Sequence, residues 1–137
     1  MVTIEFNNRT KYKFPKTAVY CVFKKANKFL RVKKKQILSL AFVDEAEIKK
    51  LNKRYRGKNK ITDVLSFEAR EKDCLGEIII CPAQAKKQAK EFKQSYQKEI
   101  VKLALHGYLH IMGYDHEKEV EAGEMEKLER RVLGYGV

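Results

Sequence analysis

The most informative part of this 137-residue sequence reads Ile100-Val101-Lys102-Leu103-Ala104-Leu105-His106-Gly107-Tyr108-Leu109-His110-Ile111-Met112-Gly113-Tyr114-Asp115-His116. Residues 100–112 are apolar nearly all round at helical spacing, which predicts a helix buried in the core. Gly113 is placed to end this helix. The other elements are therefore expected to pack against it.

Hydrophobic periodicity places strands and helices along the rest of the chain. Strands are expected at 2–6, 37–43, 64–67 and 75–81, and helices at 16–30, at 45–56, from Pro82 to a break at Gln94-Ser95, and after 116. Asp44 and Glu47 form a capping box before the second helix, and Gly57 is placed to end it. The last helix is amphipathic and is expected to turn Val120, Met125, Leu128 and Val132 inward and its acids outward. Phe29 is expected on the apolar stripe of the first helix.

This order of elements predicts an α+β fold in which helices pack on one small mixed β-sheet. The length and the 44% hydrophobic content favour a single domain over 1–137. No stretch approaches the roughly 18 apolar residues of a transmembrane helix, and residues 1–5 lack a signal-peptide pattern, so a soluble, cytoplasmic protein is expected. Cys21, Cys74 and Cys81 have no C-x-x-C spacing and are interpreted as buried thiols of a reducing compartment.

The charge of the chain is strongly positive and unevenly placed. Thirty Lys and Arg against 18 Asp and Glu give a formal net charge of +12. Residues 1–40 hold eleven basic side chains and one acid, whereas 115–131 hold seven acids and four bases. A single run such as Lys33-Lys34-Lys35 can simply solvate the surface, but the whole asymmetry favours an anionic partner bound by the N-terminal half.

The three histidines of the chain fall within eleven residues. His106 and His110 are four apart on the predicted helix, so they project from one face one turn apart, and the turn at Gly113 allows His116 to return as a third ligand. Imidazoles favour zinc, and three protein ligands leave a position for a water that becomes a nucleophile. Cys74 or Cys81 could also approach in the fold. The pattern therefore predicts a zinc site suited to hydrolysis.

The histidine spacing equals that of the metzincin peptidases, H-E-x-x-H-x-x-G-x-x-H. Gly107 stands where those enzymes carry the glutamate that acts as general base, so a peptidase is the weaker interpretation. Asp115 could orient a ligand imidazole or assist the water, or it could be a solvent-facing turn residue.

The histidine stretch resembles the H-G-x-L-H-x-x-G-Y-D-H signature of the bacterial YbeY family of metal-dependent endoribonucleases. Two further blocks agree with that family. They are Leu51-Asn52-Lys53-Arg54-Tyr55-Arg56-Gly57 with Thr62-Asp63-Val64-Leu65-Ser66-Phe67, and Leu75-Gly76-Glu77-Ile78. Ile61 stands where the family usually has proline, and Glu77 where it usually has aspartate. With these blocks in order, the resemblance covers essentially the whole chain.

The resemblance implies a zinc ion held by His106, His110 and His116 and a functional arginine at Arg56. Arg56 alone reads as a surface arginine at a helix end, but its guanidinium can also hold a phosphate in a bidentate fork. Asp63 and Ser66 could support the site, or they could be ordinary turn and strand residues.

The expected function is a single-strand-specific, zinc-dependent endoribonuclease. The resemblance to the YbeY family implies that it acts in maturation of the 16S rRNA 3′ end and in ribosome quality control, with ribosomal RNA and the small ribosomal subunit as partners. Single-stranded RNA is the expected ligand of the basic half, no membrane partner is expected, and the protein is expected to be a monomer or weak oligomer. A metzincin-type hydrolase and a non-catalytic ribosome-binding factor stapled by zinc are the alternatives.

Overall fold

The computed structural model describes residues 2–32, 35–113 and 119–133. Its elements in chain order are β1 (Val2–Asn8), α1 (Lys16–Leu30), β2 (Gln36–Phe42), α2 (Glu45–Arg56), β3 (Val64–Glu71), β4 (Cys74–Ile80), α3 (Pro82–Glu91), α4 (Tyr96–Ile111) and α5 (Glu119–Leu133). The described elements therefore follow the order that the hydrophobic periodicity predicts.

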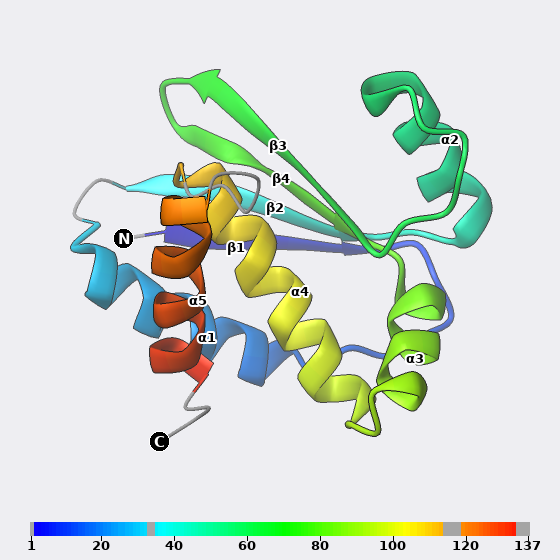
Figure 1. Ribbon diagram of the computed structural model, residues 1–137. Helices are drawn as coiled ribbons and strands as arrows, with labels where there is room; N and C mark the ends of the chain where they lie inside the picture. The colour runs from blue at the N-terminus through cyan, green and yellow to red at the C-terminus, as the bar shows by residue number, and fades with distance from the viewer. Residues whose placement is uncertain (1, 33–34, 114–118, 134–137) are drawn as a thin grey trace.

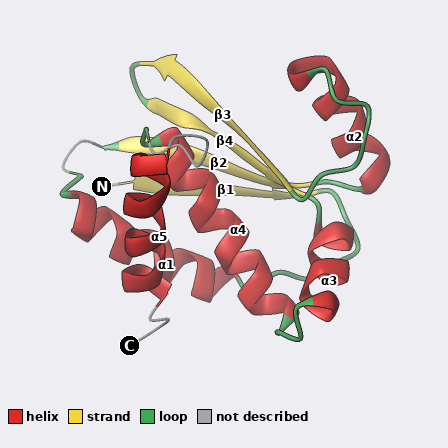
Figure 2. Ribbon diagram, in the orientation of Figure 1, coloured by secondary structure: helices red, strands yellow, loops and turns green. Residues whose placement is uncertain are grey.

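The four strands form one mixed sheet, drawn as a single layer in Figure 2. Its strand order is β1-β2-β4-β3. β1 pairs with β2, and β2 with β4, in parallel, whereas β3 and β4 form an antiparallel pair. The expected α+β fold with a small mixed sheet is confirmed, and β3 is left at an edge of the sheet.

Helices cover the two faces of the sheet unequally (Figure 1). The large core cluster joins α1, α4 and the end of α5 to one face, through side chains such as Leu40 and Ile78 of the sheet and Leu105 of α4. α2 lies on the other face, where its buried Ile48 packs with Leu65 of β3. Consequently α4 and α2 approach the edge strand β3 from opposite sides of the sheet.

Local signals at the ends of the helices match the structure. The Asp44 carboxylate accepts a hydrogen bond from the Glu47 N–H at 2.8 Å, and Gly57 ends α2 with a φ of 70° that favours glycine. Gly113, with a φ of 104°, follows the end of α4.

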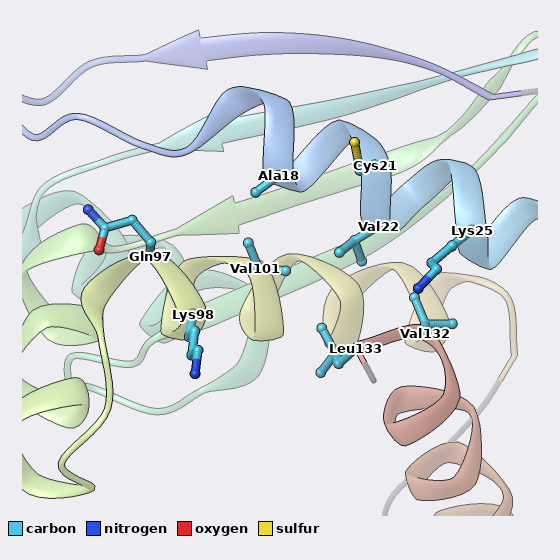
Figure 3. A pocket seen from close by; sticks show the side chains of 9 residues that line it. All are labelled: Ala18, Cys21, Val22, Lys25, Gln97, Lys98, Val101, Val132 and Leu133. Atoms are coloured by element: carbon cyan, nitrogen blue, oxygen red, sulfur yellow. The ribbon is translucent and has the colours of Figure 1, made fainter. Parts of the chain in front are cut away.

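The C-terminal end of α5 lies against α1 and α4. Val132 is buried there, and Val132 and Leu133 line an apolar groove of about 410 Å³ between the three helices (Figure 3). The inward placement of Val132 is confirmed, while the side chains of Val120, Met125 and Leu128 lie outside those that the structure describes. This contact fixes the position of α5 beside α4.

Two predictions about side-chain burial were wrong. Cys21 is exposed on α1 and Cys74 is only half-buried, so Cys81 alone of the three cysteines is a buried thiol. Phe29 is 45% exposed, with the guanidinium of Arg131 5.6 Å from its ring centroid.

Among the described residues, no helix is both long enough and apolar enough to cross a membrane.

Candidate functional site

His106 and His110 lie next to each other on α4, as their spacing predicts. Their ring centroids are 4.7 Å apart and the ring planes are inclined by 65°. Both residues are half-buried, although most of the helix around them is fully buried. α4 thus holds two imidazoles at the border between core and solvent.

Arg56 reaches the same region from the other face of the sheet. It is the last residue of α2, and the preceding Tyr55 packs edge-to-face on Phe67 of β3 with ring centroids 5.1 Å apart. Asn52, which is 1% exposed, donates from Nδ2 to the Lys60 carbonyl at 2.9 Å and holds the following loop against the helix. These contacts place the C-terminal end of α2 over the edge strand.

The histidines and the arginine line one cavity of about 320 Å³, here called the histidine cavity. Its lining residues are Tyr55, Arg56, Val64, Leu65, Ser66, Phe67, His106 and His110. No carboxylate belongs to this described lining, which instead offers a guanidinium, two imidazoles and a serine side chain. The histidine cavity is therefore suited to an anionic group.

A second cavity, of about 490 Å³, shares Val64 and His106 with the first. It is here called the acidic cavity, because Asp63, Glu99 and Glu129 line it. Asp63 does not line the histidine cavity. Its Oδ1 accepts from the Val64 N–H at 2.7 Å and its Oδ2 from Gln88 at 3.1 Å.

The carboxylate of Glu99 is buried in the wall of the acidic cavity. Glu99 is 2% exposed, accepts from Gln88 at 3.2 Å, and also accepts from Gln94. Gln88 therefore bridges Glu99 and Asp63, and this hydrogen bonding satisfies a carboxylate that would otherwise be costly to bury.

Gly107 faces the sheet and not either cavity. A Cβ placed on it would lie 2.9 Å from Cγ2 of the fully buried Ile78. The absence of a side chain therefore allows α4 to approach β4 closely. A glutamate at this position would meet the sheet, so the local packing excludes the metzincin general base.

A family model described as endoribonuclease YbeY matches residues 4–135 of the chain. The chain belongs to the YbeY endoribonuclease family. The endoribonuclease YbeY of Staphylococcus carnosus is 42% identical, with 73% of this chain and 72% of that protein covered. The endoribonuclease YbeY of Bdellovibrio bacteriovorus is 48% identical over 64% of this chain and 59% of its own length. Membership of the YbeY family makes the protein a hydrolytic nuclease.

A solved structure shares the fold of this protein over nearly the whole chain. The solution structure of TM1509 from Thermotoga maritima matches with a TM-score of 0.66 and 29% sequence identity, covering 98% of this chain and 90% of that one. The positions at which the sequence departs from the YbeY pattern, Ile61 and Glu77, both lie outside the lining of the histidine cavity.

The described part of the YbeY signature offers two nitrogen ligands for a metal ion. Within residues 2–32, 35–113 and 119–133, no group of three or more His, Cys, Asp or Glu side chains is placed to hold a metal. The third histidine, His116, and Asp115 lie outside the described residues. Two half-buried imidazoles one turn apart beside a cavity fit the donor set of a zinc site.

Two residues beside the YbeY histidines were missed from the sequence. Tyr55, which the sequence did not single out as a site residue, is 56% exposed and lines the histidine cavity. Glu129 was expected to face outward, but its Oε1 lies 3.5 Å from Nδ1 of His106. Periodicity could not reveal the second contact, because it joins two helices whose relative placement depends on the whole fold.

Proposed function

We propose that this protein is a zinc-dependent endoribonuclease that cleaves single-stranded RNA, with ribosomal RNA of the small subunit, at the 16S rRNA 3′ end, as its substrate. The observation that carries the proposal is the histidine cavity, in which Arg56 from α2 meets His106 and His110 from α4. A phosphodiester is the anionic group that such a set of donors suits.

His106, His110 and His116 would hold the zinc ion. When bound, zinc supplies a Lewis acid that polarises a phosphoryl oxygen and lowers the pKa of a coordinated water. The apolar packing of α4 supports this role, because a helix held rigidly in the core keeps two ligands in fixed register.

Arg56 would bind the phosphate that is cleaved. Its planar fork donates two parallel hydrogen bonds to phosphate oxygens and stabilises the negative charge that grows on them during the reaction. The contact between Tyr55 and Phe67 holds the helix end that carries Arg56, and the Ser66 hydroxyl can donate to the same group. The attacking oxygen comes from water or from the RNA 2′-hydroxyl, and a 2′,3′-cyclic phosphate in the product would identify the hydroxyl.

The basic N-terminal half would hold the RNA backbone without reading its sequence. Lys24, Lys25 and Lys28 are exposed on α1, and Lys11 and Lys13 are exposed before it. Such contacts act through phosphate charge and weaken as salt rises. We place the protein in the cytoplasm, as a single domain and a monomer or weak oligomer, with a role in ribosome quality control.

The two alternative functions fit less well. A metzincin-type peptidase needs a general base where Gly107 packs on Ile78. A ribosome-binding factor stapled by zinc does not need Arg56 beside the two histidines. Metal analysis combined with RNA cleavage distinguishes these alternatives from an endoribonuclease.

The test combines metal analysis with RNA cleavage on the same purified samples. We expect one zinc per chain, cleavage of a single-stranded RNA oligonucleotide that a chelator stops and zinc restores, and loss of both zinc and cleavage in His110→Ala. Hydrolysis of casein with RNA left intact would support the peptidase instead. Cleavage that persists unchanged in His110→Ala would indicate a contaminating nuclease.

A further inference from the structure

Within the described part of the chain, the carboxylate of Glu129 on α5 lies against a histidine of the YbeY signature. Its Oε1 lies 3.5 Å from Nδ1 of His106, and the two side chains are 14% and 28% exposed. Partial burial lowers the local dielectric and strengthens such a contact relative to a surface pair. The contact comes from α5, a helix that carries neither Arg56 nor any of the three proposed ligands.

The position of Glu129 follows from how α5 is anchored. Val132 and Leu133, one turn further along α5, lie against α1 and α4 at the apolar groove (Figure 3). This packing sets the distance of α5 from α4, and residue 129 then faces the side of α4 that carries His106. The packing of Val132 and Leu133 therefore holds Glu129 beside His106.

The ring of His106 belongs to both cavities. It lines the acidic cavity together with Glu129, and the histidine cavity together with His110 and Arg56. Nδ1 faces Glu129, so Nε2, on the opposite side of the ring, is the nitrogen that would coordinate an ion held by His106 and His110. A neutral imidazole can donate a hydrogen bond from one nitrogen and coordinate a metal through the other. The hydrogen-bond acceptor determines which nitrogen carries the proton, and so which one coordinates the metal.

We propose that Glu129 is a positioning residue for the metal site: its carboxylate accepts a hydrogen bond from Nδ1–H of His106 and so holds the imidazole in the tautomer and orientation that present Nε2 to the ion. This inference rests on the proposed role of His106 as a zinc ligand. A carboxylate behind a ligating histidine raises the basicity of the ligand, and its removal typically costs 10- to 100-fold in metal affinity.

The first readout needs no metal. Metal-free protein is studied by nitrogen-15 correlation spectra of the histidine side chains, at about two pH units above the ordinary histidine pKa of roughly 6.5. We expect His106 to carry its proton on Nδ1 in the wild type and in Glu129→Gln, whose amide oxygen still accepts. In Glu129→Ala we expect the proton to move largely to Nε2.

The second readout is zinc affinity, measured by competition with a chromophoric chelator. We expect Glu129→Ala to bind zinc about 10- to 100-fold more weakly and Glu129→Gln to lie between it and the wild type. Glu126→Gln is the matched control, because Glu126 is exposed, lies one turn earlier on α5 and lines the same acidic cavity. It removes the same charge from the same cavity and should change the affinity less than twofold.

The outcomes separate this inference from the proposed function. An unchanged His106 tautomer in a folded Glu129→Ala variant would overturn the positioning role, and so would equal losses of affinity in Glu129→Gln and Glu126→Gln. If instead wild-type protein bound no zinc while the tautomer responded to Glu129, the pairing would stand and the zinc site would be wrong.

Discussion

Gly107 of α4 lies directly over Ile78 of β4, so close that a Cβ on the glycine would stand 2.9 Å from Cγ2 of the isoleucine. Ile78 is β-branched and fully buried, and it has no room to move away. We expect Gly107→Ala to lower the free energy of unfolding by about 1–2 kcal/mol in urea titrations, since overpacking outweighs the better helix propensity of alanine.

A double-mutant cycle checks that the Ile78 contact is the cause. Ile78→Ala alone should cost about 2–5 kcal/mol, because it leaves a cavity. The double variant should cost clearly less than the sum of the two single changes, since the new methyl group enters that cavity. Additive costs would show that Gly107 is needed for another reason.

The edge-to-face contact of Tyr55 with Phe67 fixes the helix end that carries Arg56. We expect Tyr55→Ala to lower stability by only about 1 kcal/mol, because the ring is largely exposed, but to slow RNA cleavage about 10- to 100-fold, since a small displacement of a catalytic group is costly. Tyr55→Phe keeps the ring and should cleave within about threefold of the wild type. If Tyr55→Ala cleaved RNA at the wild-type rate, the contact of Tyr55 with Phe67 would not be needed to position Arg56.

The ionisation of Tyr108 makes the free energy of unfolding depend on pH in alkaline solution. Burial raises its pKa to about 12, and its hydroxyl donates to Asn27 Oδ1. Unfolded tyrosine ionises near ~10, so the unfolded state loses this proton first as the pH rises. The contribution of Tyr108 is therefore constant below pH ~10 and falls by about 2–3 kcal/mol between ~10 and ~12. In Tyr108→Phe, urea titrations across this range should show a correspondingly smaller decline, and an equal decline would contradict the assignment.

The secondary structure could be predicted from the sequence because its signals are local. Alternation of apolar residues marked β1, and the capping box of Asp44 and Glu47 marked the start of α2. The all-round apolar pattern of 100–112 correctly predicted that α4 is buried. The adjacency of His106 and His110 also followed, since it depends only on the helical repeat.

The rest of the site depends on contacts between elements far apart in the chain. Arg56 meets the histidines because β3 is an edge strand approached from both faces, and hydrophobic periodicity does not give strand order. Glu129 was assigned to a solvated face for the same reason. Cys21 was wrongly assigned to the core from its residue type, although its position on α1 lies opposite the stripe formed by the buried Val19 and Phe23.

Single-turnover cleavage of a single-stranded RNA oligonucleotide by zinc-loaded Arg56 variants is the most direct test of the central claim, that Arg56 and the histidines act on one phosphate. We predict that Arg56→Ala loses about 10²–10³ in rate with zinc content and melting temperature unchanged, and that Arg56→Lys recovers only a small part, because lysine lacks the bidentate fork. Lys53→Ala removes the same charge from the same exposed helical turn and should cleave like the wild type. Wild-type rates in Arg56→Ala, or equal losses in Arg56→Ala and Lys53→Ala, would contradict the claim.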